Sequence, residues 1–136
     1  MTSWIDDELD RLGRAVELQI TSRRSDGSLR PYVTIWGVRS GDDLYVRSAH
    51  GPENGWFRLA KASGRGRVRA GGVEHDVAFE VPGPEVDRPL DEAYHAKYDR
   101  YGPGPVGSVV TAEAARSTLR LMPTSAGAEP DRPSES

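Results

Sequence analysis

Apolar and polar residues alternate with a period of two in the first half of the chain, which is the pattern of β-strands. The clearest alternation runs through Val16, Leu18 and Ile20. The next run, 31–38, is apolar at nearly every position, so we expect its strand to be covered on both faces. A third strand is expected at 44–49. Short turn sequences separate these runs, which predicts an antiparallel meander.

The strongest strand signal lies in the middle of the chain. Two alternating runs within 67–81 are joined by Gly71 and Gly72, and a Gly-Gly pair suits the positive φ angles of a tight hairpin turn. A short strand is possible at 108–111, and 117–123 predicts the last one.

Three segments show helical spacing instead. In 3–14, Ser3 stands three residues before Asp6, which is the spacing of a capping box. Further helices are expected at 53–62 and 91–101. In chain order, these elements favour a mainly β (α+β) domain, a small antiparallel barrel with two or three helices packed outside it.

The composition limits the rest of the interpretation. At 136 residues, residues 1–123 fit one domain, and 124–136 reads as a disordered tail rich in Ser, Pro and acidic residues. The chain has no cysteine, which excludes disulfides and thiol nucleophiles and favours a reducing cytoplasm. The start of the chain is acidic rather than a signal peptide, and no apolar run approaches the roughly 18 residues of a membrane span.

Charge is unevenly distributed. The formal net charge is −3, yet 39–70 holds seven basic and three acidic residues. A local positive field in an acidic protein favours a small anionic ligand over nucleic acid, with a merely solvated basic face as the plain alternative.

The histidines do not predict a metal site, because none has a second histidine three or four residues away. His75 shares its strand phase with Val73, Val77 and Phe79, so it points inward. It is either a core histidine with one hydrogen bond or a base that lines a pocket.

Polar and basic residues gather where the third strand passes to the next helix. Arg47 and Ser48 end the strand, while Arg58 and Lys61 lie three residues apart on the helix. If that helix folds back over the strands, these groups could converge on an anion. Two aromatic residues near them, Trp36 and Trp56, either pack in the core or wall a slot for a planar ring.

Taken together, the runs LYVRSAHG, GWFR, the AGG hairpin and AYHAKY resemble a bacterial family known as domain of unknown function 2255, over roughly 15–123. The order of elements is similar to the flavin-binding split barrel of pyridoxamine-phosphate-oxidase-like proteins and deazaflavin-dependent nitroreductases.

That resemblance implies a homodimer with FMN or a deazaflavin in a groove, although some split-barrel proteins bind haem or no cofactor. It implies that Arg47, Ser48, Arg58 and Lys61 hold the cofactor phosphate, and it places Arg24, Ser25 and Arg30 in the deazaflavin-type loop. That loop departs from the pattern, since Asp26 stands between Ser25 and Gly27. We add Trp36 and Trp56 to the expected cofactor-binding set as an aromatic wall.

The sequence therefore favours a cytoplasmic, flavin- or deazaflavin-binding split-barrel protein, an oxidoreductase acting on a small organic substrate, with a proton donor among His75, Tyr94 and Tyr98. The alternative is a cofactor-free small-molecule-binding protein, or an acid–base isomerase or cyclase that uses the barrel pocket.

Overall fold

The computed structural model describes residues 4–48, 55–101, 107 and 110–124. Its strands are β1 (Leu18–Ser22), β2 (Val33–Ile35), β3 (Gly37–Ser40), β4 (Asp43–Val46), β5 (Arg65–Ala70), β6 (Val73–Glu80) and β7 (Leu119–Pro123). Its helices are α1 (Asp6–Arg14), α2 (Gly55–Ser63), α3 (Asp87–Tyr98) and the short α5 (Ala112–Ala115), with single 3-10 turns η1 (Pro84–Val86) and η2 (Asp99–Tyr101).

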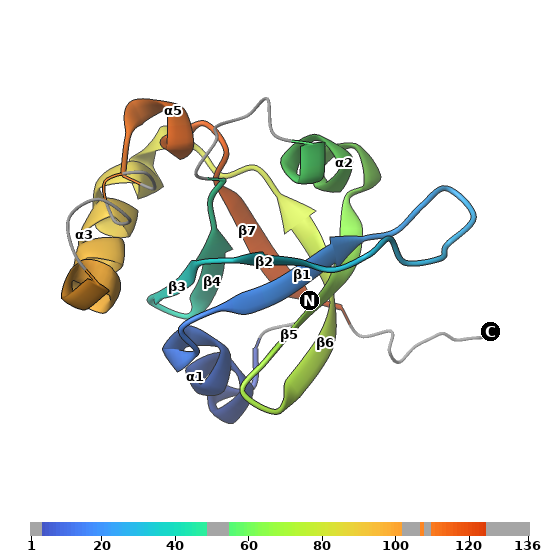
Figure 1. Cartoon of the computed structure of the whole chain (residues 1–136), viewed down its shortest axis with the longest axis horizontal. Helices are drawn as coiled ribbons and strands as arrows, with labels where there is room; N and C mark the ends of the chain where they lie inside the picture. The colour runs from blue at the N-terminus through green and yellow to red at the C-terminus, as the bar shows by residue number, and fades with distance from the viewer. Residues whose placement is uncertain (1–3, 49–54, 102–106, 108–109, 125–136) are drawn as a thin grey trace.

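All strands of the described part belong to one antiparallel sheet in the order β2-β1-β5-β6-β7-β4-β3. The two edge strands, β2 and β3, are separated along the chain by Trp36 alone. The sheet must therefore curl until its edges approach each other, and Figure 1 shows the nearly closed barrel that results. The predicted small split barrel of α+β class is confirmed.

The prediction of one continuous strand at 31–38 is wrong, because the chain changes edge within it. Gly37 allows this change: a Cβ there would lie 3.0 Å from the carbonyl oxygen of Tyr45 and 3.1 Å from a methyl group of Val46. On the α3 side, the Tyr94 hydroxyl donates to the Trp36 carbonyl (3.0 Å). A glycine and a fixed carbonyl thus hold the bend between β2 and β3.

Element ends also differ from the predictions. Helix α1 begins at Asp6 with Ile5 as N-cap and no side-chain cap bond from that residue, and Ser3, the predicted cap, lies outside the described residues. Helix α3 begins at Asp87 rather than at residue 91, since Pro89 falls in the first turn, where the missing N–H is tolerated. In the expected strand at 108–111, residues 110 and 111 form a bend, and 108–109 lie outside the described residues. The expected tail also lies outside them, except for Thr124.

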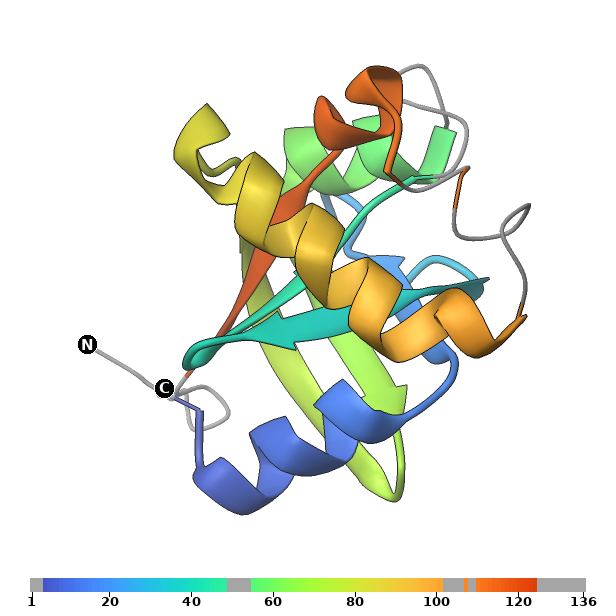
Figure 2. The same ribbon diagram turned by 90° about the vertical axis from the view of Figure 1, so that its left-hand side faces the viewer.

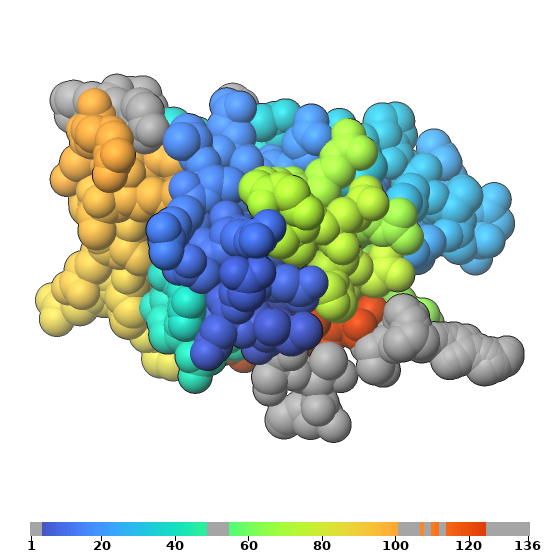
Figure 3. Space-filling model, turned by 90° about the horizontal axis from the view of Figure 1, so that it is seen from below, coloured from blue at the N-terminus to red at the C-terminus, as the bar shows by residue number. Residues whose placement is uncertain are grey.

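The helices cover different parts of the barrel. Figure 1 shows α1 and α2 at opposite ends, and Figure 3 shows α1 against the β5–β6 hairpin. Leu9 and Leu12 of α1 and Phe57 and Ala60 of α2 enter the same buried core. Helix α3 crosses the outer side of β3 and β4 (Figure 2), where a second cluster of Leu90, Tyr94, Tyr98, Val38 and Tyr45 is buried. None of the helices in the described ranges has the length and apolar character needed to cross a bilayer.

Candidate functional site

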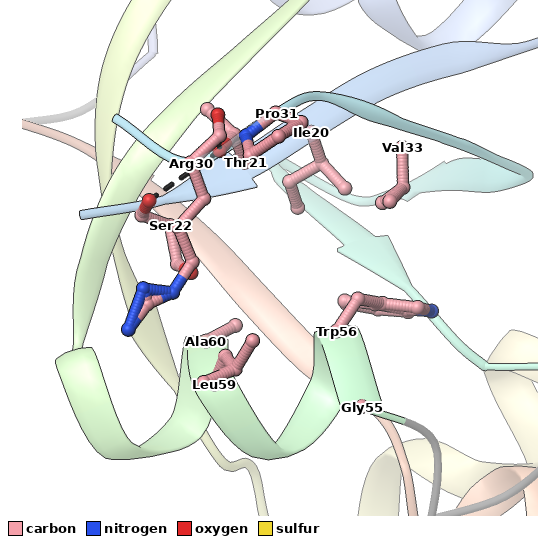
Figure 4. Close-up of a pocket in the computed structure, with 10 residues that line it drawn as sticks. All are labelled: Ile20, Thr21, Ser22, Arg30, Pro31, Val33, Gly55, Trp56, Leu59 and Ala60. Carbon is pink, nitrogen blue, oxygen red and sulfur yellow. Dashed lines mark hydrogen bonds between the residues drawn. The ribbon is translucent and has the colours of Figure 1, made fainter. Parts of the chain in front are cut away.

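A pocket of about 310 Å³ opens between α2 and the strands β1 and β2. Figure 4 shows Ile20 and Val33 on the strand side, Leu59 and Ala60 below them on α2, and the Trp56 indole at one end. These side chains are apolar, and the volume is at the lower end of the roughly 300–1,000 Å³ of small-molecule sites. The pocket is thus suited to a flat, largely apolar group.

A second hollow of about 490 Å³ continues from this pocket, since Arg30 and Leu59 line both. Its walls come from the loop between β1 and β2, from the C-terminal half of α2 and from the start of β5. Four of its residues are arginines and none of its described lining residues is acidic; the arginines are Arg23, Arg24, Arg30 and Arg65. We call this hollow the arginine groove. A ligand could extend from the apolar pocket into a strongly positive field.

The loop that carries this charge is held by its own hydrogen bonds. Arg23 donates to the carbonyl of Gly27 (2.7 Å) and Arg24 to that of Leu29 (3.0 Å). The carboxylate of Asp26 accepts bonds from the hydroxyl and the N–H of Ser28, and these bonds lower the pKa of Asp26. Asp26, the residue that departs from the deazaflavin pattern, therefore organises the turn.

Arg47 and Ser48, predicted to hold a phosphate, are buried away from this pocket. The Arg47 guanidinium donates to Asp91 (2.6 Å) and to the hydroxyl of Thr118 (3.0 Å), and it lies beside the Tyr94 ring. The N–H of Ser48 donates to the hydroxyl of Ser117 (2.9 Å). Arg47 continues the face of Tyr45, opposite the core residues Leu44 and Val46, and α3 covers that side.

The tyrosines and Trp36 form a stack beneath α3. Trp36 lies parallel to Tyr98, with ring centroids 3.9 Å apart. The Tyr98 hydroxyl donates to the carbonyls of Val16 (2.6 Å) and Gly37 (3.1 Å), and burial raises the pKa of Tyr94 far above its usual range. These three residues do not line the apolar pocket, and their contacts are those of a clamp on the bend after β2.

His75 is part of the contact between β6 and α1. Its ring meets the edge of Trp4 at 5.3 Å, and its Nδ1 lies 2.7 Å from the carbonyl of Asp76. Its Nε2 is 3.9 Å from the Glu8 carboxylate. The residue is a partly buried histidine with backbone and carboxylate neighbours, remote from the apolar pocket.

Of the predicted catalytic and cofactor-binding residues, Trp56 alone is among the described residues that line the apolar pocket. His75 lines a separate hollow with Arg67 and Asp76. Arg58 and Lys61 are exposed on α2 and line neither hollow. Reasoning from spacing missed Ser22 and Arg65, while the resemblance did single out Arg30. The signal for Ser22 was present, because a serine ends an otherwise apolar strand face before an arginine-rich turn.

No group of three or more histidine, aspartate or glutamate side chains with metal-binding geometry occurs in the described part of the chain. The site is therefore characterised by an aromatic wall, an apolar interior and arginine charge.

Solved structures of low sequence identity share the fold. The heme storage protein HutZ from Vibrio cholerae has a TM-score of 0.58 at 12% identity, covering 91% of this chain and 92% of that chain. A putative pyridoxamine 5'-phosphate oxidase from Listeria innocua has a TM-score of 0.55 at 16% identity, with 87% and 91% covered. An FAD-binding protein from Mesorhizobium loti has a TM-score of 0.52 at 17% identity, with 91% and 92% covered.

A comparison with curated proteins finds no match. The model of a bacterial family, described as an uncharacterized protein conserved in bacteria (DUF2255), matches residues 8–121. The barrel, its order of strands and this match over most of the chain agree with the resemblance seen in the sequence. The chain belongs to the DUF2255 family.

Proposed function

We propose that the protein binds a flavin or deazaflavin, with the tricyclic ring in the apolar pocket between α2 and β1–β2, and acts as an oxidoreductase on a small organic substrate. The observation that carries this proposal is the junction of an apolar, Trp56-walled pocket with the arginine groove. A planar ring with an anionic arm matches both halves. The fold shared with an FAD-binding protein is consistent with it.

The described residues would bind and orient such a cofactor. Trp56 offers an aromatic surface for the ring, while Ile20 and Val33 exclude water from the opposite wall. The hydride chemistry itself would be supplied by the bound cofactor. The exposed Leu59, 43% accessible, lies at the junction of pocket and groove and would be covered by the ligand.

Acid–base catalysis without a cofactor is less well supported. Among the described residues that line the apolar pocket, none is a histidine, carboxylate, lysine or tyrosine. An isomerase or cyclase needs a positioned proton donor or acceptor within hydrogen-bond reach of its substrate. The proposed donors His75, Tyr94 and Tyr98 lie under α1 and α3 instead.

The test is a titration of the purified protein with FMN, FAD and a deazaflavin, followed by visible absorbance and tryptophan fluorescence. We expect saturable quenching by at least one of them. Trp56→Ala should weaken that binding at least tenfold, whereas Trp56→Phe, which keeps an aromatic wall, should retain most of it. Absence of any spectral change and any quenching would refute the proposal, as would saturable binding of hemin alone.

The proposal includes a cytoplasmic homodimer, as the resemblance implies. Light scattering of the purified protein, with and without flavin, measures its mass. A monomer under both conditions would remove the dimer from the proposal and leave the pocket unaffected.

A further inference from the structure

We infer that the arginine groove is an anion-binding subsite in which Arg30 and Arg65 hold the phosphate or carboxylate arm of the ligand. The inference rests on the proposed function, since it concerns the same ligand. It assigns the anionic arm of that ligand a position different from the one expected from the sequence. That position is over the C-terminal half of α2, where Ala62 and Ser63 line the groove. It is not the end of β4, where Arg47 and Ser48 are already bonded within the protein.

Only part of the charge in the groove is neutralised within the described residues: Arg23 pairs with Asp76 (3.1 Å), whereas Arg30 and Arg65 have no such partner. Other arginines on the same sheet have carboxylate partners, as in the pairs Arg39–Asp42, Arg67–Asp76 and Arg69–Glu74. In the part of the chain that the structure describes, the guanidinium groups of Arg30 and Arg65 form no hydrogen bond or ion pair, and no described residue lining the groove is acidic. Two such guanidinium groups in one hollow favour an anion, which would accept paired hydrogen bonds from them.

A buried hydroxyl provides a second and independent indication. Ser22 is only 5% accessible and lines the apolar pocket, yet its hydroxyl has no partner within the described ranges. Buried polar groups are almost always hydrogen-bonded. A buried hydroxyl without a partner at a cavity wall therefore indicates that a ligand atom forms the missing hydrogen bond. Figure 4 shows the side chains of Ser22 and Arg30 together at the end of the pocket above Ala60, opposite Trp56.

The subsite is already in place without a ligand. The N–H of Arg30 donates to the Ser22 carbonyl (3.0 Å), and the Thr21 hydroxyl donates to the Arg30 carbonyl (2.6 Å). The N–H of Arg23 donates to the carbonyl of Arg65 (2.9 Å). These backbone bonds fix both arginines on β1, the following loop and β5, so little ordering is required when an anion binds.

The chemistry that fits is an aromatic ring joined to an arm with one or more phosphates or carboxylates. Either kind of anion satisfies guanidinium donors and a serine hydroxyl. The ring would lie against Trp56 and the arm would pass Ser22 and Arg30 toward Arg65. The arm therefore determines affinity and the apolar pocket determines ring orientation.

FMN and riboflavin test this inference, because they share one ring and differ by one phosphate. We expect the wild-type protein to bind FMN at least tenfold more tightly than riboflavin at low salt, with the difference shrinking as salt is raised. Arg65→Gln and Arg30→Gln should each reduce FMN affinity several-fold. Arg65→Gln should leave riboflavin affinity unchanged, since Arg65 lines the arginine groove and not the apolar pocket that would hold the ring.

The matched control is Arg58→Gln, which removes an equal charge from the exposed side of α2. It should leave the preference for FMN intact. Equal affinities of the wild type for FMN and riboflavin, or an Arg30→Gln, Arg65→Gln double variant that binds FMN like the wild type, would overturn the subsite. Either result would leave the flavin proposal standing.

If no flavin binds, the proposed function fails and the subsite is tested with pyrophosphate and with citrate. Each is added to the wild type and to the double variant, and Tm is measured. A rise in Tm for the wild type only supports the subsite, and the more effective anion separates a phosphate arm from a carboxylate arm. No rise with either anion, or the same rise in both proteins, overturns it.

Discussion

The carboxylate of Asp91 on α3 lies 2.6 Å from Nη1 of Arg47. Arg47 directly follows β4 and points to the outside of the barrel, where α3 buries it completely. The same guanidinium reaches Thr118 just before β7. One arginine therefore joins two neighbouring strand ends to the helix above them. A charge buried in this way is stable only while its partners remain.

Replacing Arg47 should accordingly destabilise the fold. We expect Arg47→Met to lower the free energy of unfolding by about 1.5–3 kcal/mol, because Asp91, whose side chain is 40% exposed, and the Thr118 hydroxyl lose their charged donor. Chemical denaturation measures the difference. The exposed Arg58→Met should change stability by no more than about 0.5 kcal/mol. Normal stability of Arg47→Met together with weakened FMN binding would instead support the strand-end anion site expected from the sequence.

Tyr98→Phe tests whether the Tyr98 hydroxyl, in the motif AYHAKY, holds the bend after β2 or acts in catalysis. The substitution removes the hydroxyl that bonds the carbonyls of Val16 and Gly37. We expect a loss of about 0.5–1.5 kcal/mol in stability, since the part-buried Val16 carbonyl loses its donor while the Gly37 carbonyl keeps the Lys97 amine (2.7 Å). Flavin affinity should be unchanged at a temperature where the variant is folded. Lost turnover at unchanged stability would make Tyr98 a proton donor.

Gly66→Ala should be among the most damaging small substitutions. A Cβ at this position of β5 would lie 1.9 Å from the carbonyl oxygen of Thr21 and 2.9 Å from the Phe79 ring. Because a backbone atom cannot give way like a flexible side chain, we expect a loss above about 3 kcal/mol or failure to fold. The matched control is Gly55→Ala on α2, where a Cβ meets nothing within 4 Å. Equal Tm values for the two variants would contradict the close approach of β5 to β1.

Lys97 should make stability depend on pH. Burial lowers the pKa of its amine to about 8, while the unfolded chain has a lysine pKa near 10.4. Between these values the unfolded state binds more protons than the folded state, so this residue makes stability rise with pH from about 8 upward. Below pH 8 both states are protonated and the destabilisation is fully present.

Denaturation of the wild type and Lys97→Met at several pH values from 7.5 to about 9.5, within this window, checks the slope. The wild type should gain stability with pH relative to Lys97→Met. Lys61→Met, on the exposed side of α2, should follow the wild type. Parallel curves for all three proteins would show that burial does not lower the pKa of Lys97.

Local patterns were enough to predict some parts of this molecule. The β5–β6 hairpin follows from alternation and from Gly71 and Gly72, both of which adopt positive φ. Helix α1 follows from its apolar stripe. The division of 31–38 between two sheet edges could not be read from the run, because it depends on Gly37 packing against β4 and on carbonyls held from α3.

The candidate site shows the same limit. The alternation of Leu44 and Val46 with Tyr45 puts Arg47 on the outer face, but no local pattern says that α3 covers that face. Conversely, Arg30 and Arg65 are 35 positions apart in sequence and meet in one groove because β1 pairs with β5. Charge clustering along the chain indicated an anionic ligand, and tertiary pairing decided which arginines remain available for it.

Strand β7 pairs with β6 on one side and β4 on the other, so the last strand of the described residues occupies the interior of the sheet. Until residues 119–123 are in place, the sheet consists of two separate pieces, β2-β1-β5-β6 and β4-β3, each with an unpaired edge. Unpaired edges promote association between chains. A chain shortened before residue 119 should therefore aggregate, and folding should be limited by this late, non-local pairing.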